Sequence, residues 1–108
     1  MNFARIQDRN KMEEHIPNIA IFASGSGTNA ENIINWSKKY RTYRVNAVFC
    51  NRPDAYVLTR AERLGIPHWT FTAAEFRSDT LIYKGRQTSL TEALADLGTG
   101  YIVLAGFL

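Results

Sequence analysis

The segment NIAIFASGSGTNAENII, residues 18–34, decides the fold. It opens with a continuous apolar run from Asn18 to Ala23, which is typical of a strand buried on both faces of a parallel sheet. A short run of glycine, serine and threonine follows, and residues 28–40 then place apolar side chains along one helical face. A strand, a tight glycine-rich turn and a helix in this order predict the start of a βαβ unit.

The remaining chain repeats this alternation of strand and helix. We expect further strands at residues 45–50, 68–71 and 101–105, and helices at residues 55–64 and 89–97. The element order β-α-β-α-β-α-β predicts an α/β fold, a Rossmann-like open parallel sheet in three α/β/α layers.

The expected element boundaries come from local signals. Asp54 is the expected N-cap of the second helix, and Gly65 and Gly98 are expected to end the second and third helices. The third helix could begin as early as Tyr83, and residues 72–79 carry no clear pattern. We expect the whole chain, 1–108, to form one domain. Its polar first part, 1–17, is expected to be a short helix or a disordered lead.

Composition limits the class of protein. The net charge is +3, and no run of lysine and arginine resembles a nucleic-acid-binding arm; Lys38, Lys39 and Arg41 are expected to form the solvated end of a helix. No apolar run approaches the roughly 20 residues that span a membrane, and residues 1–15 lack an apolar signal core. The single cysteine, Cys50, is expected to be a buried thiol and not a metal ligand, which fits a cytoplasmic protein.

The glycine-rich turn is the candidate binding site. Gly25 and Gly27 allow the backbone to turn sharply and to approach a ligand, and Ser26, Thr28 and Asn29 add short hydrogen-bonding side chains. A helix N-terminus here carries unpaired amides and a partial positive charge, which together predict a phosphate site. The alternative is that the glycines only make the turn and that Ser26 or Thr28 caps the helix.

The type of phosphate can be narrowed. The spacing Gly25-x-Gly27-x-x-Ala30 fits a dinucleotide fingerprint, but no carboxylate follows the second strand where the ribose hydroxyls would need one, which disfavours NAD. Arg52 could meet the 2′-phosphate of NADP, so an NADP-binding fragment remains open. No Gly-Lys-Ser/Thr is present, which excludes a Walker loop. A single phosphate, as on a sugar phosphate, fits best.

Four segments carry a family resemblance. They are, in chain order, NIAIFASGSGTNAENII at 18–34, AVFCNRPDA at 47–55, ERLGIP at 62–67 and IVLAGFL at 102–108. Together they resemble the opening half of the phosphoribosylglycinamide formyltransferase family. The resemblance implies a transferase of purine biosynthesis that moves a formyl group from formyltetrahydrofolate, its co-substrate, to the amine of glycinamide ribonucleotide.

The resemblance also implies roles for individual residues. Gly27, Thr28 and Asn29 would hold the ribonucleotide phosphate, within the loop that begins at Gly25. Phe107 and Leu108 would line the folate pocket, although Phe107 is also compatible with a plain core position.

The catalytic residues of the family are not expected in this chain. The family's Asn-x-His-Pro segment and a later Asp fall beyond Leu108, and His15 and His68 are expected to be ordinary histidines. We therefore assign no catalytic residue, and we expect the chain alone to be inactive. No role is assigned to Arg77, because the segment around it aligns poorly with the family.

Two further interpretations remain open at this point. The chain could be an NADP-binding Rossmann fragment, or a phosphate-binding module without catalysis. In all cases the last predicted strand, 101–105, would lie at an open sheet edge with apolar side chains, and a homodimer is one way to cover it.

Overall fold

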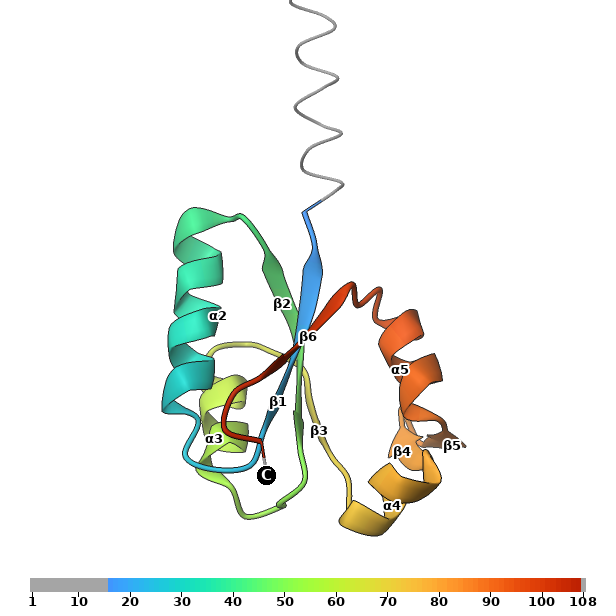
Figure 1. Cartoon of the computed structure of the whole chain (residues 1–108). Coiled ribbons are helices and arrows are strands. Elements are labelled where there is room, and N and C mark those ends of the chain that lie inside the picture. The colour runs from blue at the N-terminus through green and yellow to red at the C-terminus, as the bar shows by residue number, and fades with distance from the viewer. Residues whose placement is uncertain (1–15, 108) are drawn as a thin grey trace, which may run out of the picture.

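The fold is a parallel sheet between two layers of helices (Figure 1). The computed structural model describes residues 16–107, so most of the predicted polar lead, His15 and Leu108 lie outside the described residues. The main elements are β1 (Asn18–Ala23), α2 (Thr28–Tyr40), β2 (Arg44–Cys50), α3 (Tyr56–Arg63), β3 (His68–Thr70), α4 (Ala73–Ser78), β4 (Leu81–Tyr83), β5 (Arg86–Thr88), α5 (Leu90–Asp96) and β6 (Tyr101–Leu104).

The four-stranded sheet has the order β3-β2-β1-β6, and its three strand pairs are all parallel. β1 therefore lies inside the sheet, where Ile21 pairs with Val48 of β2 on one side and with Val103 of β6 on the other. This confirms the predicted open parallel sheet with crossover helices. The carboxyl ends of β1 and β2 lie side by side, at Ala23 and Cys50.

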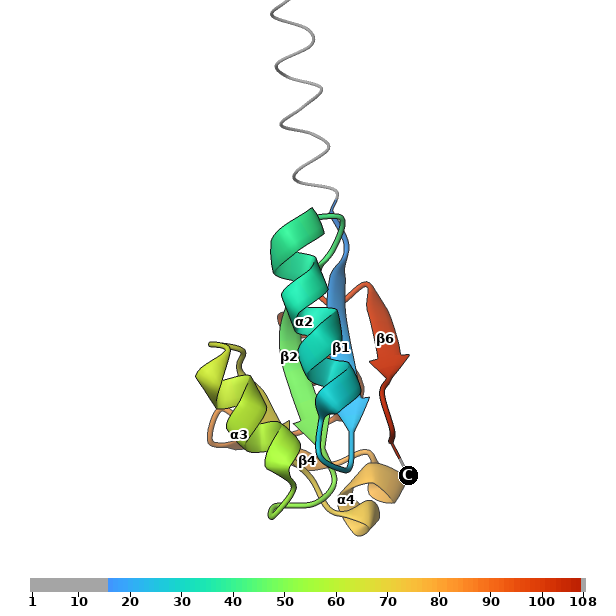
Figure 2. The ribbon, with the colours of Figure 1, turned by 90° about the vertical axis from the view of Figure 1, so that its left-hand side faces the viewer.

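Each face of the sheet is covered by a separate helical layer. α2 and α3 pack on one face, which Figure 2 views from the helical side, and α4 and α5 lie on the other (Figure 1). Side chains of a strand point alternately to its two faces, so β1 contributes Ile21 to one core and Phe22 to the other. The α2 side is aliphatic, with Ile34 and Val57, and the α5 side is aromatic.

Two of the three predicted boundary residues are confirmed. Gly65 follows α3 with φ +75°, and Gly98 follows α5 with φ +69°, a backbone region that glycine tolerates best. Asp54 is not the N-cap of α3; Ala55 holds that position, without a side-chain cap. The amide of Val57 in the first turn donates instead to the carbonyl of Gly25 at 3.2 Å, so the loop after β1 satisfies it.

The early start for the last helix is wrong. Tyr83 ends β4, which pairs antiparallel with β5 across a turn at Lys84 and Gly85, both with positive φ. α5 begins only at Leu90, after Ser89, whose hydroxyl accepts a hydrogen bond from the Glu92 amide. Positive φ at both central residues is the geometry of a two-residue hairpin turn and is incompatible with a right-handed helix starting at Tyr83.

The segment without a clear pattern, 72–79, contains α4. Thr72 and Glu75 form a reciprocal capping box, with hydrogen bonds of 2.8 and 3.0 Å between side chain and backbone amide. Asp79 ends this helix in the left-handed region, and its carboxylate accepts the amide of Leu90 at 2.9 Å. The helix is short and has no buried residue, so it leaves no amphipathic pattern in the sequence.

β6 forms an open edge of the sheet. Three of its four side chains, on both faces of the sheet, are exposed: Tyr101 is 64% exposed, Ile102 48% and Leu104 67%. Figure 2 shows β6 to one side of α2, beyond the helical layer. No charged residue occurs from 97 to 108, so this edge lacks the lysines that commonly prevent strand pairing.

Candidate functional site

The glycine loop lies at the carboxyl end of β1, where it turns into α2. The five predicted site residues line one surface cavity of about 250 Å³, together with Ala105 and Gly106 that follow β6. The structure therefore brings together Gly25, Ser26, Gly27, Thr28 and Asn29, as we expected. A larger cavity of about 640 Å³ lies at the opposite end of the sheet, and no predicted site residue contributes to it.

The carbonyl groups of the loop are held by protein contacts. The Gly25 carbonyl accepts the Val57 amide at 3.2 Å, and the Ser26 carbonyl accepts Nε of Arg60 at 2.7 Å. The Gly27 carbonyl accepts the Glu31 amide at 2.8 Å, the first hydrogen bond of α2. Three consecutive carbonyls therefore have partners in α2 or α3.

The amides of the loop are arranged differently. Ser24 donates its amide to the Gly106 carbonyl at 3.2 Å. Within residues 16–107, the five amides from Gly25 to Asn29 donate to no protein group. They belong to the turn and the first residues of α2, where unpaired donors and the positive end of the helix dipole coincide. The loop can thus present several donors to an anion without a cationic side chain.

Gly27 is the N-cap of α2 and adopts φ +85°. A Cβ at this position would lie 2.5 Å from Cγ2 of Val57, so only glycine fits against α3. α2 has no side-chain cap, and the hydroxyls of Ser26 and Thr28 lie 3.3 Å from each other. The alternative that Ser26 or Thr28 caps the helix is therefore wrong.

A second polar link joins the ends of β1 and β2. Ser24, which is 2% exposed, donates its hydroxyl to Oδ1 of Asn51 at 2.6 Å. Ser24 directly precedes the loop and Asn51 directly follows β2, so this hydrogen bond fixes the loop relative to the neighbouring strand. Sequence analysis singled out neither residue for this contact, because only the parallel pairing of β1 with β2 places them together.

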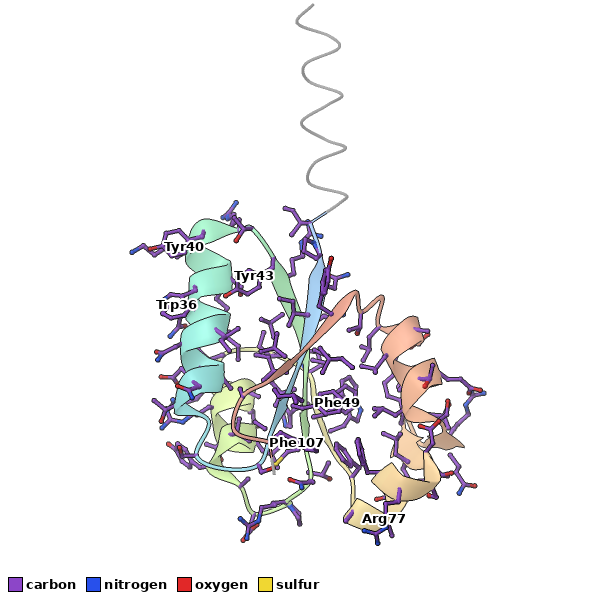
Figure 3. All side chains as sticks on the ribbon, in the orientation of Figure 1. Trp36, Tyr40, Tyr43, Phe49, Arg77 and Phe107 are labelled. Carbon is purple, nitrogen blue, oxygen red and sulfur yellow. The ribbon has the colours of Figure 1, made fainter. Side chains whose placement is uncertain are left out.

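Phe107 lies in an aromatic cluster at the same end of the sheet (Figure 3). Its ring centroid is 5.5 Å from Phe22, 6.0 Å from Phe71 and 5.9 Å from Phe76. Phe107 is half-buried, so it packs on the core with one part and exposes the other. Its partner in the folate prediction, Leu108, lies outside the described residues.

The other candidates of the sequence do not line the loop cavity. His68 begins β3, and its Nδ1 is 3.1 Å from the Ile66 carbonyl. Arg77 is exposed on α4 (Figure 3), and Arg52 is exposed after β2. Cys50 is fully buried, and burial raises the pKa of its thiol. Over residues 16–107 there is neither a cluster of three potential metal ligands nor a helix long and apolar enough to cross a membrane.

Sequence reasoning missed the contribution of α3. Val57 and Arg60 lie one turn apart on this helix. They donate hydrogen bonds to two consecutive loop carbonyls, those of Gly25 and Ser26. Glu31 of α2 completes the arrangement by pairing with Arg60 at 3.1 Å and Arg63 at 3.0 Å. No local pattern marks these residues, because their partners lie about 30 positions away in the chain.

The fold and the position of the loop place the chain among Rossmann-like α/β proteins, in which ligands bind at the carboxyl ends of parallel strands. More specifically, the chain belongs to the formyl transferase family, whose sequence model matches residues 17–108. The family resemblance drawn from the four sequence segments is thereby confirmed.

Individual relatives agree with this assignment. The phosphoribosylglycinamide formyltransferase of Escherichia coli (strain K12) is 34% identical over 92 residues, which make up 84% of this chain and 42% of the relative. The structure of glycinamide ribonucleotide transformylase 1 from Geobacillus kaustophilus matches with a TM-score of 0.72 and 31% identity, over 87% of this chain and 48% of that one. A transformylase from Symbiobacterium toebii matches with a TM-score of 0.69 and 33% identity, over 87% and 43% of the two chains. The chain thus spans less than half the length of these relatives.

Proposed function

We propose that this chain supplies the ribonucleotide-binding part of a phosphoribosylglycinamide formyltransferase of purine biosynthesis. In this reaction the amine of glycinamide ribonucleotide takes the formyl group of formyltetrahydrofolate. Family membership and the similarity to relatives with this activity support the proposal. They also argue against an NADP-binding fragment, the main alternative from the glycine spacing.

The observation that carries the proposal is the set of loop amides. The five amides from Gly25 to Asn29 have no acceptor within the described residues, and they border a cavity at the N-terminus of α2. A phosphate monoester carries negative charge and several acceptor oxygens, so it fits such a group of donors. The hydroxyls of Ser26 and Thr28 and the side-chain amide of Asn29 would add further donors.

The folate would lie beside this site. Phe107 is the proposed contact, with Leu108, because its partly exposed ring offers an aromatic face near the carboxyl end of the sheet. The groups that stabilise the oxyanion and move the proton would come from outside this chain, so the chain alone should not turn over its substrates. Formation of formylated ribonucleotide by the purified chain would contradict this part of the proposal.

The binding test compares ligands with and without the phosphate. We expect glycinamide ribonucleotide to shift the amide resonances of residues 25–29 in ¹H–¹⁵N spectra, and glycinamide riboside and NADPH to leave them unchanged. Asn29→Asp should abolish the shift by placing a carboxylate at the cavity. Asn32→Asp is the matched control, because Asn32 is exposed on the same helix and does not line this cavity. Equal shifts with the riboside, or with NADPH, would overturn the proposal.

We also propose that the chain is a cytoplasmic protein that pairs with a second copy of itself through β6. The buried thiol of Cys50 fits a reducing compartment, and the exposed apolar side chains of β6 favour a partner at this edge. No nucleic acid or membrane partner is part of the proposal, because the net charge of +3 is small and spread along the chain.

A further inference from the structure

We propose that Arg60 is a positioning residue for the glycine loop: it fixes the Ser26 carbonyl and thereby turns the Gly27 amide toward the cavity. This inference rests on the proposed phosphate site, and it adds a residue of α3 that neither contacts the cavity nor belongs to the loop.

Arg60 is itself held in place by three contacts. Its Nε donates to the Ser26 carbonyl at 2.7 Å, and its Nη1 donates to Oε1 of Glu31 at 3.1 Å. Its guanidinium carbon lies 4.9 Å from the ring centroid of Tyr56. The side chain is 21% exposed, so these hydrogen bonds are partly shielded from water. A planar guanidinium with two donors engaged has little freedom to move the carbonyl that it holds.

The effect on the Gly27 amide follows from peptide geometry. In a planar trans peptide the carbonyl and the amide of the next residue point in opposite directions. Because the Ser26 carbonyl points to Arg60 of α3, the Gly27 amide points away from α3. The same argument applies one residue earlier, where the Gly25 carbonyl accepts the Val57 amide and the Ser26 amide is turned away.

The loop needs such an external restraint. A flip of the Ser26–Gly27 peptide changes ψ of Ser26 and φ of Gly27, and glycine accepts both signs of φ. The backbone alone therefore does not prevent the flip, which would present a carbonyl to the phosphate in place of an amide. The hydrogen bond from Arg60 favours the orientation that suits an anion.

Arg60 acts by position more than by charge. Its charge is paired with Glu31, which also pairs with Arg63 at 3.0 Å. Arg63 therefore offers a matched control: it has the same charge and the same carboxylate partner, but it makes no hydrogen bond to the loop. Arg60→Lys keeps the charge but loses the planar guanidinium, which donates to the Ser26 carbonyl and the Glu31 carboxylate at the same time.

The experiment measures glycinamide ribonucleotide binding and loop dynamics in full-length variants. We expect Arg60→Met and Arg60→Lys to weaken binding about tenfold, the usual effect of losing one charge-assisted hydrogen bond, and Arg63→Met to change it by about twofold or less. In the absence of ligand, both Arg60 variants should show exchange broadening of the Ser26 and Gly27 amide resonances. A merely structural role would lower stability without this local signal.

The outcomes separate this inference from the proposed function. If the wild-type chain binds the ribonucleotide and both Arg60 variants bind equally well, the positioning role is overturned while the phosphate site stands. If Arg63→Met weakens binding as much as Arg60→Met, or if Arg60→Lys restores it, charge accounts for the effect and the inference fails. If the wild-type chain does not bind, the proposed function fails, and unchanged Ser26 and Gly27 resonances in the Arg60 variants would then overturn the inference independently. If Arg60→Met does not fold, binding and exchange broadening are measured in Arg60→Lys alone.

Discussion

Gly27 lies against Val57 so closely that a Cβ added to the glycine would be 2.5 Å from Cγ2 and 2.8 Å from Cα of the valine. Val57 is 1% exposed and belongs to the core beneath α2 and α3, so it has no room to withdraw. This contact sets the distance between the glycine loop and α3, and with it the hydrogen bonds that α3 makes to the loop carbonyls.

Gly27→Ala should therefore be strongly destabilising. The substitution combines a positive φ with a clash against backbone, and we expect the free energy of unfolding to fall by about 2 kcal/mol or more. Gly25→Ala is the control, because a Cβ there meets no atom within 4 Å and its φ is not positive. Urea unfolding measures both variants. Equal stability of the two would contradict the packing argument.

The β6 edge gives a prediction about assembly. If this edge pairs with a second copy, Leu104→Lys should shift the chain toward monomer, because a lysine on an edge strand prevents pairing. Sedimentation velocity at several concentrations measures the shift. Thr91→Lys is the control, since it adds the same charge to an exposed position of α5. A monomeric wild-type chain would contradict the proposed dimer.

Cys50 should make stability fall at alkaline pH. Burial raises the pKa of its thiol in the folded state, so the unfolded chain releases this proton first, near the ordinary pKa of about 8.5. Stability is thus complete below that value and declines as pH rises toward the folded pKa. Thermal unfolding between pH 7.5 and 9.5, on the order of one unit either side of the ordinary value, measures the decline. Cys50→Ala should show a smaller one; an equal decline would refute the assignment.

Asp96 should contribute to loss of stability in acid. The hydrogen bond from the Tyr83 hydroxyl at 2.6 Å lowers the pKa of Asp96, and Lys84 adds to the effect at 3.1 Å. Because its pKa is lowered in the folded state, Asp96 stabilises the fold at pH values above the ordinary carboxyl pKa. This contribution to stability is lost as the pH falls through the pKa that Asp96 has in the folded state.

Asp96→Asn should therefore lose less stability than the wild-type chain on acidification. Thermal unfolding at neutral pH and below the ordinary aspartate pKa of about 3.9 measures the difference. Asp54→Asn is the control, because Asp54 is exposed in the turn after β2. Wild-type behaviour of the Asp96 variant would contradict the prediction.

The sheet could be predicted from sequence because its strands are continuous apolar runs. β1 and β2 are each buried over most of their length, and α2 buries Ala30, Ile34 and Ser37 at helical spacing. The location of the glycine loop followed from the same pattern. The binding roles of Gly25 to Asn29 and of Phe107 remain predictions.

The missed features depend on contacts between distant segments or on small local turns. Asp54 does not cap α3, because the Gly25 carbonyl accepts the Val57 amide in the first turn of this helix. The hairpin of β4 and β5 is too short for a hydrophobic period to reveal it. In the sequence, Arg60 cannot be told apart from a solvent-exposed cation on a helix. Its contact with Ser26 arises only from the fold.

The central position of β1 has a consequence for the order of folding. Of the four strands in this sheet, β1 is synthesised before the others, yet it lies inside the sheet and acquires its second neighbour only after residues 101–104 have been synthesised. The side chain of Asn18 meets the Gly98 carbonyl at 3.1 Å across 80 positions of sequence, a closure that is slow compared with local helix formation. A nascent chain would therefore keep one side of this buried strand unpaired until β6 has been synthesised, and it is at greatest risk of aggregation during that interval.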